Sequence, residues 1–153
     1  MTTIQKTFTI KNYPNDVYSA VGQIIKNSQE CEQRFKTLTE MLKIPVKNIG
    51  NSSLNKLNDA LKKNGIIDEK NYGNLKQVIA VRNHINHNFF LETFNRTDVD
   101  YDERIKSLEN HLNAAQFVIC EATDFIDNII DKLNGSNIIR PTIFEQSDTN
   151  KTL

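Results

Sequence analysis

The last third of the chain carries apolar side chains at alternating steps of three and four. The stripe consists of Ile105, Leu108, Leu112, Ala115, Ile119, Ala122, Ile126, Ile129 and Leu133. These positions share one face of an α-helix, whereas a β-strand would bury every second residue. The spacing therefore predicts a long helix that buries this face against other helices and that ends at Gly135.

A second stripe of the same kind lies near the start of the chain, between Pro14 and Pro45. Proline is favoured at the first position of a helix and cannot continue one, so these two residues predict where this helix begins and ends. Its apolar face consists of Val17, Val21, Ile24, Ser28, Cys31, Phe35, Leu38 and Leu42.

Two further helices are predicted between these long ones. The shorter one starts with Ser52 or Ser53 as its N-cap, and Gly65 stops it. Its apolar positions are Leu54, Leu57 and Leu61. The other begins near Asp68, a good N-cap, and extends to about residue 95, with Gly73 in its interior.

Helices joined by short loops pack as antiparallel neighbours, so the sequence predicts an all-α, antiparallel up-and-down four-helix bundle. With 153 residues, the chain has the size of one domain. Residues 14–135 form the predicted bundle. Residues 1–13 form an N-terminal arm, which is a short strand or a packed segment carrying Ile4, Phe8 and Ile10 at alternate positions. Residues 136–153 form a polar C-terminal tail that we expect to be partly disordered.

Composition and charge exclude several classes of protein. No apolar run is long enough to span a membrane, and no signal peptide is present, so we expect a cytoplasmic protein. Cys31 and Cys120 lie far apart on apolar stripes, as reduced core thiols do. The formal net charge is zero, so a nucleic-acid partner would need a local basic patch.

A polar run interrupts the third predicted helix. Leu75, Val78, Ile85 and Phe89 have the spacing of a core-facing stripe, and Arg82 occupies the position between them where an aliphatic residue is expected. Burying a guanidinium costs several kcal/mol unless it is paired. Arg82 therefore needs either a carboxylate partner from another helix, such as Glu32 or Asp124, or a function.

Residues 82–87, with Arg82, Asn83 directly after it and His87 four residues further on, resemble the signature of the HEPN superfamily. The position on the penultimate long helix of a four-helix bundle, residues 14–135, also fits that family. Its catalytic members are metal-independent RNA endonucleases, often toxins or phage-defence effectors, in which two domains form one composite cleft. The resemblance implies that Arg82 stabilises the scissile phosphate, that His87 acts as general acid or base and that Asn83 orients one of them.

One position departs from part of that family. Members controlled by a nucleotidyltransferase carry a modified tyrosine two residues after the histidine, where this chain has Phe89. Modification at this residue is therefore excluded, and a transferase antitoxin is disfavoured. Another antitoxin or a defence-system partner remains an expectation.

The residue types support the same chemistry without the family. RNA can be cleaved by its own 2′-hydroxyl if a histidine moves the proton and an arginine stabilises the phosphorane. Asn86 and His84 are candidate substrate contacts, although His84 also fits an ordinary surface histidine and Asn86 an asparagine-rich composition. His84 and His87 have no third ligand near them in the sequence, so we expect neither a metal nor a cofactor.

Ile79 and Phe90 lie off the expected core stripe, beside the polar residues, and exposed apolar groups there predict a two-fold homodimer. Three hypotheses remain open. The chain is a dimeric ribonuclease, a catalytically silent module that binds RNA or a nucleotide or regulates a partner, or a helical scaffold with a buried ion pair. We expect neither DNA nor a membrane as partner.

Overall fold

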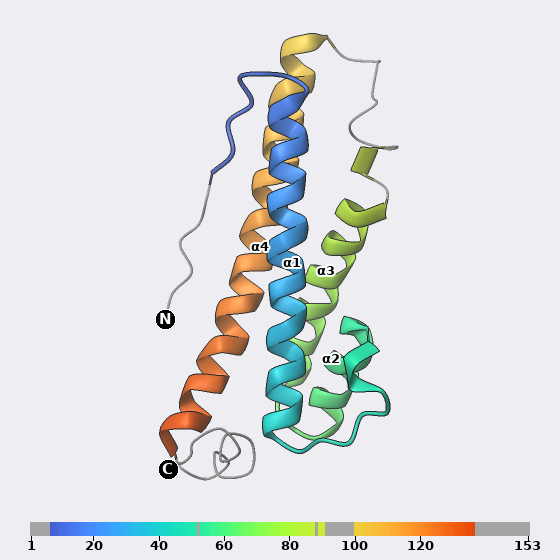
Figure 1. Cartoon of the computed structure of the whole chain (residues 1–153), viewed down its shortest axis with the longest axis vertical. Helices are drawn as coiled ribbons and strands as arrows, with labels where there is room; N and C mark the ends of the chain where they lie inside the picture. Colours follow the sequence, from blue (N-terminus) through green and yellow to red (C-terminus); the bar gives the residue numbers. More distant parts are fainter. Residues whose placement is uncertain (1–6, 52, 88, 91–99, 137–153) are drawn as a thin grey trace.

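The computed structural model describes residues 7–51, 53–87, 89–90 and 100–136, and within these ranges it is all-helical with no strand (Figure 1). The elements are α1 (Asn15–Met41), a 3-10 turn η1 (Ile49–Asn51), α2 (Leu54–Lys63), α3 (Glu69–His87) and α4 (Tyr101–Ser136). The four α-helices pack against one another, which confirms the predicted all-α class. None of the described helices is long and apolar enough to cross a membrane.

The predicted capping residues set the helix ends. The Ser53 hydroxyl oxygen accepts a hydrogen bond from the Lys56 amide at 3.3 Å, and an Asp68 carboxylate oxygen accepts one from the Asn71 amide at 2.8 Å. Gly65 has φ +75° just beyond α2, a conformation that costs glycine least. The prediction that the last helix ends at Gly135 is wrong by one residue, since α4 continues to Ser136.

Helices α1 and α4 run in the same direction. The Asn27 amide donates a hydrogen bond to the Gln116 side chain at 2.8 Å, and seven residues further along α1 Arg34 donates to Asp127 at 2.9 Å. Because the partner's number rises with the residue's own number, the two helices are parallel. An up-and-down bundle would place its first and last helices antiparallel, so that expectation is corrected here.

Helix α3 runs antiparallel to the other helices. Asn58 of α2 donates to the Tyr72 carbonyl at 3.3 Å and Lys62 of α2 pairs with Glu69 at 3.0 Å, so α2 and α3 are antiparallel. Twelve residues separate α1 from α2. A connection of that length can span about 40 Å and return the chain to the level where α2 begins. Residues 71–81 of α3 line a hollow with residues 117–125 of α4, and residues 80–85 line one with residues 111–118, so α3 is antiparallel to α4 and hence to α1. Both α1 and α2 are thus antiparallel to α3 and parallel to each other.

The core is built from the two long stripes. Every α1 position predicted to face inward is buried except Leu42 at the helix end, and the central part of the α4 stripe is buried from Leu108 to Ile126. Ile105, Ile129 and Leu133 are only partly buried, because α4 extends past its neighbours at both ends (Figure 1).

The buried stripe of α3 differs from the predicted one. Leu75, Ile79, Ile85 and Phe89 are buried, whereas Val78 is partly exposed. Ile79 was predicted to lie outside the core and is 3% exposed. Helix α3 contacts α1, α2 and α4, and three neighbours cover a wider arc than the single stripe of an edge helix.

The N-terminal arm packs on α4 and, over its described residues, forms no strand. The Phe8 amide donates to the Asn113 side-chain oxygen at 2.6 Å, and the Asn113 amide group donates back to the Phe8 carbonyl at 3.2 Å. The Ile10 amide donates to Glu109 at 2.8 Å. The α4 side chains thus take the place of a neighbouring strand. Ile4, residues 91–95 and the predicted tail after Ser136 lie outside the described residues.

Candidate functional site

Arg82 is held between two side-chain oxygens in the carboxyl-terminal half of α3. Its Nη2 donates to Glu32 Oε1 of α1 at 3.0 Å, and its Nη1 donates to Asn83 Oδ1 at 3.0 Å. The Arg82 and Glu32 side chains are 19% and 21% exposed. Of the two carboxylates considered from the sequence, Glu32 is the partner, so the structure supplies the pairing that a mostly buried guanidinium requires.

Glu32 faces two cations rather than one. Lys36, one turn further along α1, places its Nζ 3.8 Å from Glu32 Oε2 and also donates to the Gly50 carbonyl at 2.7 Å. Arg82, Lys36 and Glu32 together carry one uncompensated positive charge. A phosphate would neutralise that charge, and the arginine fork suits phosphate geometry.

The Arg82 guanidinium retains unused hydrogen-bonding capacity. An arginine has five N–H donors, and the Nε atom of Arg82 is buried without a hydrogen-bond partner. Its two terminal nitrogens each carry a second N–H beyond the bonds to Glu32 and Asn83. The buried Nε is out of reach of an anion in solution, so an anion would have to approach the terminal nitrogens through the exposed 19% of the side chain.

The predicted residues do not all share one face of α3. Asn83 lies beside Arg82 and is half-buried, whereas Asn86 and His87 are exposed at the end of the helix. At 100° per residue, His87 lies about 140° around the helix from Arg82. The structure thus brings Arg82 and Asn83 together, and it leaves the His87 ring on a different side of the same helix.

His84 lies elsewhere, in a hollow between α3 and α4. It shares this hollow with His111 and with the small or branched residues Ala80, Val81, Ile85, Ala114, Ala115 and Val118. The predicted substrate contact at His84 is therefore not brought together with Arg82 or Asn83.

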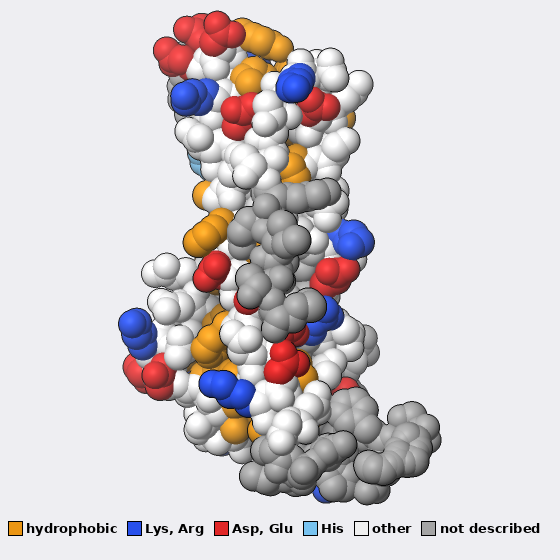
Figure 2. All heavy atoms as spheres, turned by 90° about the vertical axis from the view of Figure 1, so that its left-hand side faces the viewer, with side chains coloured by type: hydrophobic (Ala, Val, Ile, Leu, Met, Phe, Trp, Pro, Cys, Tyr) orange, Lys and Arg blue, Asp and Glu red, His pale blue; other side chains and the backbone are white. Residues whose placement is uncertain are grey.

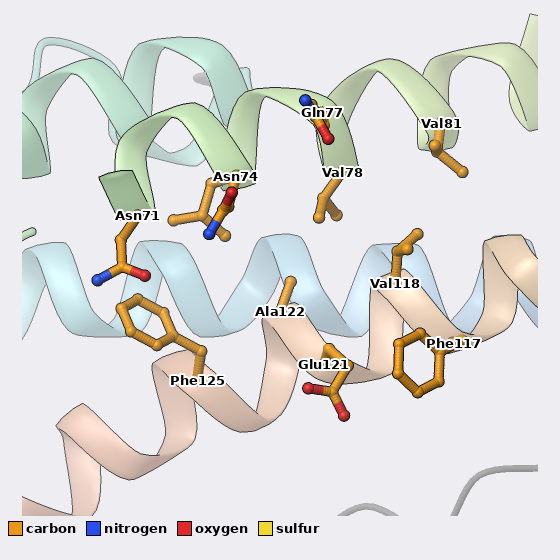
Figure 3. A pocket seen from close by; sticks show the side chains of 11 residues that line it. Asn71, Asn74, Gln77, Val78, Val81, Phe117, Val118, Glu121, Ala122 and Phe125 are labelled. Carbon is orange, nitrogen blue, oxygen red and sulfur yellow. The ribbon is translucent and has the colours of Figure 1, made fainter. Parts of the chain in front are cut away.

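A second hollow continues along the same two helices (Figure 3). Amide side chains of α3, among them Asn74 and Gln77, face Phe117, Glu121 and Phe125 of α4 across it. Phe117 is half exposed. Phe117 thus gives this groove an exposed apolar side chain, whereas Ile79 is buried, so the prediction that Ile79 contributes to an exposed patch is wrong.

Phe89 and the two cysteines are inaccessible. Phe89 is fully buried. Burial raises the pKa of the Cys31 thiol to about 11 and also raises the pKa of Cys120. Both thiols are free and buried, as predicted. Their raised pKa values keep them protonated and unreactive near neutral pH.

The surface charges are mixed on the face shown in Figure 2, where acidic and basic side chains alternate along the molecule. Within the described ranges, no three His, Cys, Asp or Glu side chains lie close enough to hold a metal ion. Comparison with protein-family models, with curated proteins and with solved structures finds no match to this chain.

The Arg82–Glu32 contact can be measured by a double-mutant cycle with Arg82→Ala and Glu32→Ala. We expect a coupling free energy of about 1–3 kcal/mol, because the hydrogen bond is charge-assisted and mostly shielded from water. Urea unfolding of the four proteins, followed by circular dichroism, gives this value.

The control is the exposed Lys26–Glu30 pair, which has a similar N–O distance of 2.9 Å on side chains that are 65% and 50% exposed. Its coupling should be at most about 0.5 kcal/mol. Equal coupling in the two cycles would contradict a shielded Arg82–Glu32 interaction.

Proposed function

We propose that the chain is a metal-independent endoribonuclease of the HEPN type that acts as a homodimer. The observation that carries the proposal is the Arg82 guanidinium, which is fixed by Glu32 and Asn83 and shares the Glu32 carboxylate with Lys36. An exposed histidine, His87, lies five residues further along the same helix.

The chemistry uses the substrate's own nucleophile. His87, as general base, takes the proton from a ribose 2′-hydroxyl while the O2′–P bond forms. Arg82 donates hydrogen bonds to the non-bridging phosphate oxygens, where negative charge accumulates. The P–O5′ bond then breaks, and the leaving oxygen takes a proton from a general acid, which is a second histidine or water. The products end in a 2′,3′-cyclic phosphate and a 5′-hydroxyl.

The separation of Arg82 and His87 around α3 favours a composite site. The helix places the two residues about 140° apart, so His87 of the same helix does not lie directly opposite a phosphate held by Arg82. A second copy related by a two-fold axis would present its own His87 opposite Arg82 of the first. Asn83 would orient the phosphate or the histidine, and Asn86 would contact the substrate.

The Arg82–Glu32 pair also favours a second candidate function. The pair accounts for a mostly buried arginine without any catalysis. The pair by itself requires no more than a helical scaffold with a buried ion pair. A catalytically silent module would in addition bind RNA or a nucleotide, or regulate a partner. As an active nuclease, by contrast, the chain would act in the cytoplasm as a toxin or phage-defence effector restrained by a partner protein.

Cleavage should not require a divalent metal. We expect single-stranded RNA to be cut equally well with and without EDTA, because the histidine and arginine replace the base and the Lewis acid of a metal site. Gel analysis should find 2′,3′-cyclic phosphate or 3′-phosphate ends. Complete loss of cleavage in EDTA, restored by magnesium, would refute this mechanism.

His87→Ala should lower the cleavage rate by about 10²–10⁴, the usual contribution of one acid–base group. Its free energy of unfolding should change by less than about 0.5 kcal/mol, because the side chain is exposed. Arg82→Lys should also lose activity, since a point charge replaces a planar fork. Asn83→Ala should lower the cleavage rate by a smaller factor than His87→Ala, because Asn83 only orients the phosphate or the histidine.

The matched control for His87→Ala is His111→Ala, which removes another exposed histidine, on α4. It should cleave RNA like the original chain. In a bacterial host, the original chain and His111→Ala should slow growth, and His87→Ala should not. If all three grow equally and no RNA is cut in vitro, the silent module is the better description.

The chain should sediment as a dimer at tens of micromolar. A composite site requires two copies, so dilution that produces monomers should lower the total activity faster than the protein concentration falls, and the specific activity should fall with it. Sedimentation velocity and cleavage assays over the same concentrations test this. A monomer that retains full specific activity would rule out the composite site.

A further inference from the structure

A half-exposed aromatic pair lies beside the polar end of α3. Tyr18 of α1 is 51% exposed, and its ring centroid lies 5.8 Å from that of Phe90, with the planes inclined by 44°. Phe90 in turn packs edge-on against the fully buried Phe89 at 5.3 Å. The exposed ring is therefore the outer member of three aromatic rings that are anchored in the core.

This pair is close to the proposed catalytic histidine. Phe90 follows His87 by three residues, so their Cα atoms can be at most about 11 Å apart in any conformation. A nucleotide next to one held at His87 can therefore reach the Tyr18 ring. The asparagines that precede His87 on α3 are Asn83 and Asn86, whose amides can both donate and accept hydrogen bonds.

We infer that Tyr18 and Phe90 form a platform on which one unpaired base of a single-stranded RNA stacks beside His87. This inference rests on the proposed function for the identity of the ligand. Every base has a flat π-face, so stacking on an aromatic ring tolerates any sequence. The bases of an A-form duplex are already stacked and its major groove is too narrow for side chains, so the platform selects unpaired RNA.

The size and surroundings of the pair favour a base over a protein partner. A stable protein interface uses about 20–30 residues on each side around an apolar centre. Here one half-exposed ring contacts one partly buried ring, and the last residues of α3 before them in the chain, Asn86 and His87, are polar and exposed. The groove between α3 and α4 is the larger apolar surface, and neither Tyr18 nor Phe90 lines it.

Binding is tested in the His87→Ala background, so that the RNA is not cut. Fluorescence anisotropy of a labelled single-stranded oligonucleotide should show that adding Tyr18→Ala weakens binding about 5- to 150-fold, the value of one stacked base. Tyr18→Phe keeps the ring and should bind within about twofold of its parent. The loss should persist as salt is raised, because stacking is not a charge interaction.

The matched control is Tyr101→Ala. Tyr101 is 53% exposed and also packs on one ring, that of Tyr13, at 5.8 Å, but neither residue is near His87 in the sequence. This variant should bind like its parent. In the cleaving chain, Tyr18→Ala should raise KM and leave kcat within about twofold, since stacking serves ground state and transition state alike.

The outcomes separate the platform from the proposed function. If RNA binds and Tyr18→Ala binds equally well, the platform is wrong, and the ribonuclease proposal stands if the original chain cuts RNA. If the original chain cuts no RNA but its binding depends on Tyr18, the platform stands and the enzyme does not. If Tyr18→Ala converts a dimer to a monomer, or no RNA binds at all, the base platform is overturned.

Discussion

A positive charge on the buried stripe of α3 constrains the whole arrangement of helices. Arg82 occupies a position where an aliphatic side chain would pack, so α1 must bring a carboxylate to it, and Glu32 does so. That pairing sets the position of α3 along the axis of α1, because residue 82 of α3 must lie level with residue 32 of α1. Lys36 then adds a second cation to the same carboxylate, and the cluster keeps a net positive charge beside a mostly buried guanidinium.

Much of the fold follows from local rules, and the sequence could therefore predict it. The period of the apolar stripes and the caps at Ser53, Asp68 and Gly65 depend only on neighbouring residues. The direction of a helix depends on the path of the connection that precedes it. The burial of Ile79 depends on the number of helices that pack around α3. Neither property can be predicted from a few neighbouring residues. The parallel arrangement of α1 and α4 is therefore known only from the structure.

The same distinction applies to the site. Arg82 and Asn83 are adjacent in the chain, so their association was predictable, and Glu32 was one of the carboxylates considered for Arg82. Tyr18 could not be associated with Phe90 from sequence, because the two residues come from different helices and meet only through tertiary packing. Its only sequence signal is its position off the apolar stripe of α1.

The contacts of the N-terminal arm have a consequence for how the chain acquires its structure during synthesis. Phe8 is bound by Asn113, 105 positions later in the chain. A ribosome that has made the arm and the first three helices has not yet made the residues that hold the arm. The first described residues to leave the ribosome are thus among the last to be fixed, and until α4 emerges the backbone groups of Phe8 and Ile10 have only water to bind.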